Sequence, residues 1–256
     1  RIEILRGPQS GLYGADAMAG VIDITTAQGQ GRFRPFVRME GGSYGTFNQV
    51  LGMRGSEGRF HYNVTLSHYR QVGFHSVPKY IENYAESFAP LTKEQRRRGN
   101  TYDNRSANIR LGYDVTDNLD LGLTARVMQG NYRSYGSYEM LDEVEGYAGR
   151  ERQRTIQNEA IVRGTAHLSS WNGRFDQEIG LGYMTDWRNF RYTGTSVDGS
   201  ARLYDPSYYR SDRLKIDWHG TLDLKGYGTV LLGAEHFHET YYGNESNKTG
   251  TTYSPY

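Results

Sequence analysis

The chain has 256 residues and a formal net charge of +1, and this near-neutrality argues against bulk binding of nucleic acid. It contains no cysteine, which excludes disulfide bonds and thiolate metal sites. No apolar run of about eighteen residues is present, so no transmembrane helix is predicted, and the mean hydropathy is −0.75.

The first stretch of the chain predicts two short strands joined by a tight corner. Ile2 and Ile4 alternate with charged neighbours, as in a half-buried strand, and Gly7-Pro8 breaks that strand. Residues 10–14 predict a glycine-hinged corner, because glycine adopts left-handed backbone angles at little cost. Residues 20–26 predict a second strand. Small-residue packing of this kind is typical of a compact segment enclosed by a larger structure.

After a flexible hinge at residues 28–31, apolar and polar residues alternate with a period of two. We count about nine such segments. They are 33–41, 44–53, 59–70, 105–115, 119–130, 156–169, 174–190, 211–224 and 229–242. Short turns alternate with long loops at 71–104, 131–155 and 191–210, as in outer-membrane barrels. We expect residues 243–256 to begin another polar loop.

Charged side chains recur on one face of these predicted strands and apolar side chains on the other. The charged set is Arg110, Asp114, Asp120, Arg126, Glu159 and Arg163. Burying these charges unpaired in a dry core would cost several kcal/mol each, so the charged face is expected to be wet. Strands of roughly 10–15 residues favour a tilted membrane wall over the shorter strands of soluble sheets. A soluble barrel or sandwich turned inside-out has the same alternation.

Aromatic residues near the strand ends fit the girdles that mark membrane–water interfaces. They are Tyr69, Tyr113, Trp171, Tyr183, Trp187, Tyr241 and Tyr242.

The opening residues resemble the end of the plug domain of TonB-dependent outer-membrane receptors. The match comprises Glu3, Leu5, Arg6, Gly7, Pro8, Ser10, Leu12, Tyr13, Gly14, Ala17, Gly20, Val21, Ile22, Ile24 and Thr25. Ala19 stands where a second glycine is usual, and Asp23 stands where asparagine is usual. The resemblance is specific, but it covers only the start of the chain.

This resemblance implies an all-β fold: a partial transmembrane antiparallel β-barrel, with about nine of an expected twenty-two strands, and the C-terminal piece of a plug. We expect residues 1–27 to end the plug domain, 28–31 to form the hinge, and 32–256 to form the N-terminal barrel strands. The chain starts without Met or a signal peptide. We therefore expect a fragment whose TonB-contacting box lies upstream.

The resemblance also implies a function: import of a scarce nutrient across the outer membrane of a Gram-negative bacterium. The ligand binds outward loops and the plug. TonB, energised by its inner-membrane partners, then opens the plug without covalent chemistry or a cofactor. The implied ligand is most often a ferric siderophore, and cobalamin or another corrinoid is the alternative. Outer-membrane lipid and lipopolysaccharide would surround the wall. Readings from other classes are a passive porin and a soluble β-sandwich binding module.

Two sets of residues are candidates for function. Aromatic rings together with arginine guanidinium groups suit flat, acidic, aromatic ligands. The ligand-contact candidates are Tyr132, Tyr135, Tyr138, Arg191, Tyr192, Tyr204, Tyr208 and Tyr209. By resemblance, the structural or gating residues of the plug are Arg6, Gly7, Pro8, Leu12, Tyr13, Gly14 and Gly20. The family pairs this plug arginine with glutamates on later strands, so we expect Arg6 to be unsatisfied or to have a substitute partner.

Other chemistry is weakly supported by the sequence. His236 and His238 share one strand face, but no third metal ligand is evident by spacing. The acidic stretch 139–145 lacks the spacing of a calcium loop. The basic run 96–98 could contact lipopolysaccharide phosphates or an anionic ligand, although a solvated loop explains it equally well. Ser10 lies one place away from a nucleophile elbow, and no enzyme activity is predicted.

Overall fold

The computed structural model describes residues 2–8, 18–24, 29–74, 99–135, 152–195, 201–203, 206–244 and 248–255. Among these residues there is no helix that is long and apolar enough to cross a membrane. Their regular structure is antiparallel β-sheet throughout.

The strands form two separate sheets. β1 (Ile2–Arg6) and β2 (Gly20–Ile24) pair into a two-stranded sheet, which we call the N-terminal hairpin. The others form one 11-stranded sheet, which we call the wall. Its strands are β3 (Arg34–Gly42), β4 (Thr46–Glu57), β5 (Phe60–Phe74), β6 (Asn100–Thr116), β7 (Leu119–Tyr135), β8 (Arg152–Ser170), β9 (Phe175–Thr195), β10 (Ala201–Leu203), β11 (Ser207–Asp223), β12 (Thr229–Gly243) and β13 (Lys248–Pro255).

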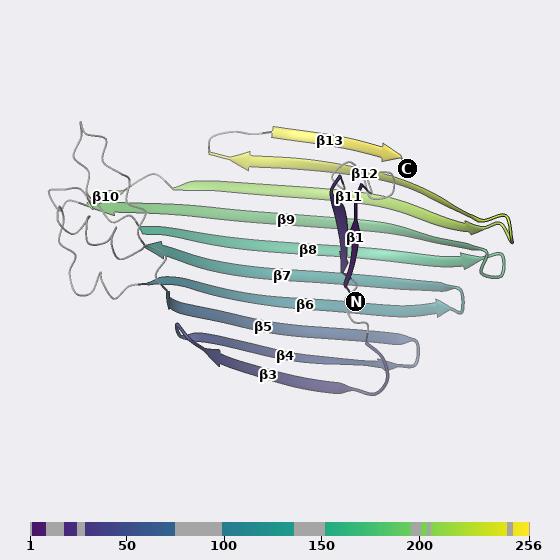
Figure 1. Cartoon of the computed structure of the whole chain (residues 1–256), viewed down its shortest axis with the longest axis horizontal. Helices are drawn as coiled ribbons and strands as arrows, with labels where there is room; N and C mark the ends of the chain where they lie inside the picture. Colours follow the sequence, from purple (N-terminus) through teal and green to yellow (C-terminus); the bar gives the residue numbers. More distant parts are fainter. Residues whose placement is uncertain are drawn as a thin grey trace.

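The wall is an up-and-down meander. Its strands follow one another in chain order from β3 to β13, except that the short β10 pairs with β9 beside this path (Figure 1). β9 is 21 residues long, whereas strands of globular proteins usually have about five or six residues. Within the described residues β3 and β13 are the two edges of the wall.

The alternation in the sequence predicts these strands correctly. Every predicted segment between residues 33 and 242 is a strand of the wall, and both strands predicted near the N-terminus pair in the hairpin. The predicted all-β, antiparallel architecture is therefore confirmed. Apart from β3, these strands are longer than predicted, because backbone hydrogen bonds to a neighbouring strand extend pairing beyond the alternating core.

The predicted loop bounds are wrong in several places. β7 and β8 reach into the predicted loop 131–155, and β9, β10 and β11 occupy most of 191–210. The last residues do not simply begin a polar loop, since β13 pairs with β12 from Tyr241 opposite Lys248 to Ala234 opposite Pro255. These segments lack a clear apolar alternation, and pairing with a neighbour is what makes them strands.

The two faces of the wall differ sharply in chemistry. Paired residues of adjacent strands point to the same side. Val64, Ile109, Ala125, Val162 and Tyr183 follow one another in register across β5 to β9 on the apolar face.

On the opposite, polar face the same strands carry the predicted charged set. Arg110, Thr124 and Arg163 are in register across β6, β7 and β8, and Asp114 lies opposite Asp120. All six predicted charges lie on this face, as expected, but toward the strand ends the apolar face carries charges too, among them Arg105 and Arg133. Two aromatic residues of the predicted girdles, Tyr69 and Tyr241, are instead on the polar face, because each is in register with polar-face neighbours.

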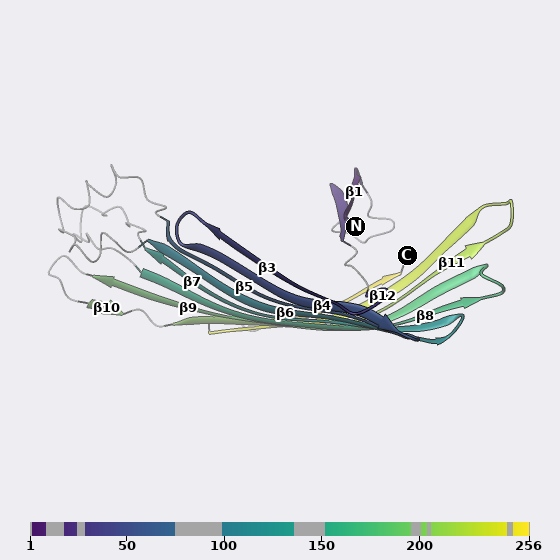
Figure 2. The same ribbon diagram turned by 90° about the horizontal axis from the view of Figure 1, so that it is seen from below.

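The wall is curved, and the N-terminal hairpin lies on its concave side (Figure 2). Leu121 is 45% exposed and Val127 is 51% exposed on the apolar face, so no second layer of the described residues covers that face. This arrangement is the reverse of a soluble sandwich, whose apolar faces meet in a shared core.

The connection between hairpin and wall is anchored at two glycines. The carbonyl of Gly31 accepts a hydrogen bond from the Ser56 amide at 2.7 Å. Gly29 is buried, and a Cβ atom there would overlap the backbone carbonyl oxygen of Tyr62. The predicted hinge therefore packs directly against β4 and β5, and the close approach requires glycine.

Candidate functional site

The polar face is organised around Arg163 of β8. Its guanidinium donates two hydrogen bonds to Asp217 of β11, from Nη1 to Oδ1 at 2.6 Å and from Nη2 to Oδ2 at 2.7 Å. Glu178 of β9 lies 3.5 Å away. Asp217 is only 6% exposed. A bidentate pair between an arginine and a largely buried carboxylate has well-defined geometry and is stronger than a neutral hydrogen bond.

Glycine in the intervening strand permits this pair. Gly180 of β9 is in register with Asp217, and a Cβ atom there would lie 2.6 Å from Cζ of Arg163. The guanidinium thus crosses β9 in the space that any other side chain at position 180 would occupy. We call Arg163, Gly180 and Asp217 the cross-strand clamp.

Other ion pairs extend the clamp over the polar face. Asp186 is 8% exposed, accepts from Gln157 at 3.0 Å, and pairs with Arg188 at 2.7 Å. Lys215 contacts Glu235 at 2.6 Å, and Arg213 contacts Glu239 at 2.7 Å. The remaining pairs on this face include Arg126–Glu159, His61–Asp114 and His167–Asp120. Most charged side chains on the central strands of the polar face are therefore paired with an opposite charge.

Aromatic side chains gather on the polar face beyond these charges, toward the end of the wall where β5 and β7 end. The aromatic patch comprises Tyr69, Tyr102, Tyr132, Phe190, Tyr192 and Tyr209. Ring centroids of Tyr69 and Tyr102 are 5.9 Å apart, and those of Phe190 and Tyr209 are 5.7 Å apart.

The register and one hydrogen bond join the rest of the patch. Tyr102 pairs with Tyr132, and Thr155 lies between Tyr132 and Phe190 in the same row. Gln153 donates to the hydroxyl of Tyr192 at 3.3 Å. Half-buried rings with hydroxyl groups can stack on a flat ligand and donate hydrogen bonds to it.

No group of three metal-ligating side chains is found among the described residues. His236 and His238 lie on one face of β12, as expected, opposite Ile216 and Leu214 of the apolar face. The acidic stretch 139–145 and the basic run 96–98 lie outside the described residues.

Solved structures of uptake receptors share this architecture. The ferric yersiniabactin uptake receptor FyuA from Yersinia pestis aligns with 99% of this chain and 47% of its own, at 15% identity and a TM-score of 0.57. BauA, the ferric preacinetobactin receptor from Acinetobacter baumannii, aligns with 99% of this chain and 49% of its own, at 12% identity and a TM-score of 0.62.

The copper transporter OprC aligns with 98% of this chain and 46% of its own, at 14% identity and a TM-score of 0.57. The chain has the fold of a TonB-dependent receptor. It spans about half the length of these three proteins. No protein-family model matches the sequence, and no curated protein matches it.

Within this receptor fold the predicted ligand-contact residues fall into two groups. Tyr132, Tyr192 and Tyr209 lie on the polar face in the aromatic patch, whereas Arg191 and Tyr208 lie on the apolar face. Tyr135 is the last residue of β7. The positions predicted in loops at 132, 135, 191, 192, 208 and 209 are strand positions, which corrects that prediction. Tyr138 and Tyr204 lie outside the described residues.

Sequence reasoning missed Tyr69, Tyr102 and Phe190 as members of the patch. Each continues the period-two pattern of its strand on the polar side. Tyr69 and Phe190 lie inside predicted strands, and only Tyr102 required an extension of the strand predicted at 105–115. Of the plug-motif residues, Gly20 pairs with Arg6 in the hairpin, and Gly7 and Pro8 follow β1. Arg6 is exposed, and no carboxylate of the described residues pairs with it. Leu12, Tyr13 and Gly14 lie outside the described part of the chain.

Proposed function

We propose that this chain supplies the end of the plug, the hinge and the first half of the wall of a TonB-dependent receptor in the outer membrane of a Gram-negative bacterium. In this assignment residues 1–27 end the plug, 28–31 are the hinge, and 32–256 belong to the barrel. Three observations support it: the plug-like opening sequence, the receptor fold, and the hairpin on the concave polar face.

The ligand of the complete receptor is a ferric siderophore. The observation that carries this assignment is the aromatic patch on the polar face. Its rings offer flat surfaces for stacking, and its hydroxyl groups can donate to the charged oxygens of an iron chelate. Next to the patch, the ion pairs of the polar face offer a hydrated, charged surface along which a polar complex can pass. Binding and release involve no covalent step, and TonB supplies the work that moves the plug.

Cobalamin is the second candidate ligand, because a corrin ring is also flat and could stack on the patch. The receptors compared above are described as handling iron chelates and copper. That set favours an iron chelate.

Readings from other classes fit less well. A passive porin would have no use for a hairpin on the concave side of the wall (Figure 2). A soluble sandwich would leave the wide apolar face in water, where contiguous apolar patches of this extent are rarely tolerated.

The test uses the full-length receptor in detergent and four probes: ferric yersiniabactin, ferric preacinetobactin, ferric citrate and cobalamin. Tyr132→Ala should weaken binding of the preferred iron chelate about tenfold, since stacking on one aromatic ring contributes about 1–2 kcal/mol. Tyr208→Ala, on the opposite face, is the matched control and should bind as the wild type does. Equal affinity of both variants for every probe, or tight binding of cobalamin alone, would contradict a siderophore site in the patch.

A further inference from the structure

The hairpins of the wall are joined at one end by a contact that occurs three times. Short turns connect β4 with β5, β6 with β7, β8 with β9 and β11 with β12 at this end, which we call the rim (Figure 1). Between the four hairpins lie three seams: β5 with β6, β7 with β8, and β9 with β11. No turn joins the two strands of a seam at the rim, yet each seam ends there in the same arrangement, which we call a rim tie.

In a rim tie, one residue of a hairpin accepts a backbone hydrogen bond from the next hairpin and donates a side-chain hydrogen bond to it. The carbonyl of Asn118 accepts from the Ser169 amide at 2.8 Å, and Nδ2 of Asn118 donates to the Ser169 carbonyl at 3.1 Å. The carbonyl of Arg174 accepts from the Asp223 amide at 2.8 Å, and Nη2 of Arg174 donates to the Asp223 carbonyl at 3.3 Å. Each tie therefore pairs both backbone groups of a residue at a strand end.

The first tie, made by Arg59, has the most contacts. The carbonyl of Arg59 accepts from the Asp114 amide at 2.9 Å, and its Nη1 donates to the Val115 carbonyl at 2.6 Å. Asp117 lies 3.6 Å from its Nη2. A bulge between Asp114 and Thr116 leaves Val115 out of the register with β7. Arg59 thus binds a residue that the sheet pairing leaves out, through a charged donor that makes a stronger bond than a neutral amide.

The first tie lies beside the attachment of the hinge. The Gly31 carbonyl accepts from the Ser56 amide at 2.7 Å and from the Ser56 hydroxyl at 3.4 Å. Ser56 is three residues before Arg59, so the hinge and the tie share one end of the β4–β5 hairpin. Among the described residues, β1 and β2 pack extensively only against each other. A pull on the N-terminal hairpin therefore reaches the wall through the hinge and the β4–β5 hairpin.

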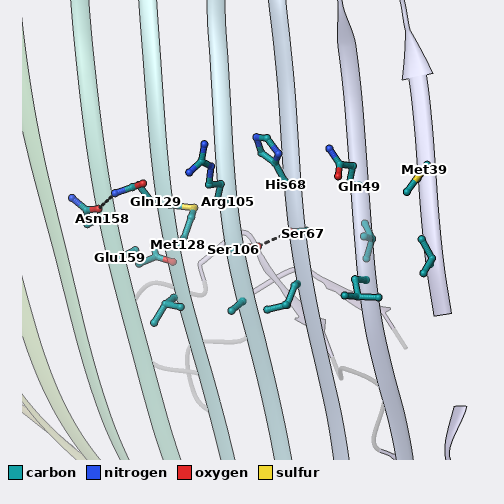
Figure 3. A pocket seen from close by; sticks show the side chains of 16 residues that line it. Met39, Gln49, Ser67, His68, Arg105, Ser106, Met128, Gln129, Asn158 and Glu159 are labelled. Atoms are coloured by element: carbon teal, nitrogen blue, oxygen red, sulfur yellow. Dashed lines mark hydrogen bonds between the residues drawn. The ribbon is translucent and has the colours of Figure 1, made fainter. Parts of the chain in front are cut away.

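The seams also have side-chain hydrogen bonds away from the rim. Figure 3 shows Ser67 bonded to Ser106 across β5 and β6, at 2.7 Å, and Gln129 bonded to Asn158 across β7 and β8, at 3.1 Å. None of these bonds involves a tie residue. Removal of one tie should therefore loosen the rim and leave the rest of the seam paired.

We propose that Arg59 anchors the hinge, because its tie holds the β4–β5 hairpin against β6 while TonB pulls on the plug. Without the tie, the turn and the hinge attached beside it can lift from β6 together. With the tie, the pull must displace two hairpins at once. This inference rests on the proposed function, in which residues 28–31 link the plug to the wall and TonB supplies the pull.

The test holds the full-length receptor in a phospholipid bilayer and applies a constant force to its N-terminus. The wild type should extend its plug, pause, and then release residues 32–57 in a step of roughly 90 Å. In Arg59→Ala the pause should be about fivefold shorter, because hydrogen bonds from a charged group are lost. The effect is limited because Arg59 keeps 54% of its side chain exposed. Arg59→Lys keeps one donor for the Val115 carbonyl and should recover part of the pause.

Arg174→Ala is the matched control, because it removes the same kind of tie two seams away from the hinge. Its pause should equal that of the wild type, since the pull reaches that seam only after the nearer hairpins have left the wall.

Equal pauses in Arg59→Ala and the wild type would overturn the proposal. So would a pause in Arg174→Ala as short as that in Arg59→Ala, because the ties would then support the wall in general and not the hinge. The force is applied without TonB or ligand, and binding of TonB and of the ferric siderophore is measured separately on the same samples. Absence of that binding, together with the expected pauses, would overturn only the proposed function.

Discussion

The cross-strand clamp predicts that Gly180→Ala destabilises the protein by breaking the ion pair between Arg163 and Asp217. In Gly180→Ala the new Cβ pushes the guanidinium of Arg163 away from Asp217. Breaking a buried ion pair costs about 3–5 kcal/mol. Arg163 keeps 34% of its side chain exposed and retains Glu178 at 3.5 Å. We therefore expect Asp217→Asn to lower the free energy of unfolding by only about 2–3 kcal/mol.

The two substitutions should not be additive. Alanine in a strand is intrinsically better than glycine by about 0.5–1 kcal/mol, so Gly180→Ala alone should cost about 1–2 kcal/mol. With Asp217→Asn already present there is no pair left to break, and Gly180→Ala should then be neutral or slightly stabilising. The coupling free energy of this double-mutant cycle should be about 2 kcal/mol.

The assay is urea-induced unfolding of the full-length receptor in phospholipid vesicles, followed by tryptophan fluorescence. Gly164→Ala is the matched control, because nothing lies within 4 Å of a Cβ atom there and the residue is on the strand next to Gly180. Additive effects of Gly180→Ala and Asp217→Asn, or a neutral Gly180→Ala, would refute the crossing of Arg163 over position 180.

Three further predictions test the wall and its hinge. The chain has no native cysteine, so single spin labels can be attached at Leu123→Cys and Thr124→Cys. The label at 123 should be more accessible to lipid-dissolved oxygen, and the label at 124 to a water-soluble nickel complex. Similar accessibility at both positions would contradict a wall with one lipid face. Lys215→Gln should lower the free energy of unfolding by less than about 1 kcal/mol, because Lys215 is 37% exposed in its pair with Glu235; a loss as large as that of Asp217→Asn would show that burial does not set the cost. Gly29→Ala should displace the hinge and speed hydrogen exchange at the Ser56 amide, since its Cβ meets the Tyr62 backbone, and unchanged protection of that amide would argue against a packed hinge.

The sequence predicted the central part of every wall strand except β10 and β13, and the chemistry of the two faces there. Alternation is a local property, because successive side chains of a strand point to opposite sides whatever the strand pairs with. This is why Ile109 and Arg110 could be assigned to opposite faces without a structure. The strand ends were harder to predict, since Tyr132 and Tyr192 follow polar, turn-like stretches. They become strand residues through pairing with neighbouring strands, Tyr132 with β6 and β8 and Tyr192 with β8.

Partner choice was beyond the reach of the sequence. Arg163 and Asp217 are 54 positions apart and lie on strands that are not neighbours. Nothing in the local sequence marks Gly180 as the residue between them.

The sequence by itself determined that the chain forms long two-faced strands after a plug-like hairpin. Only the tertiary structure decided that Arg163 crosses β9 and that six aromatic rings form one patch. The physical reason is that register arises from hydrogen bonds summed along whole strand pairs. A shift of two residues in the pairing of β8 with β9 would preserve both faces and disrupt both groups.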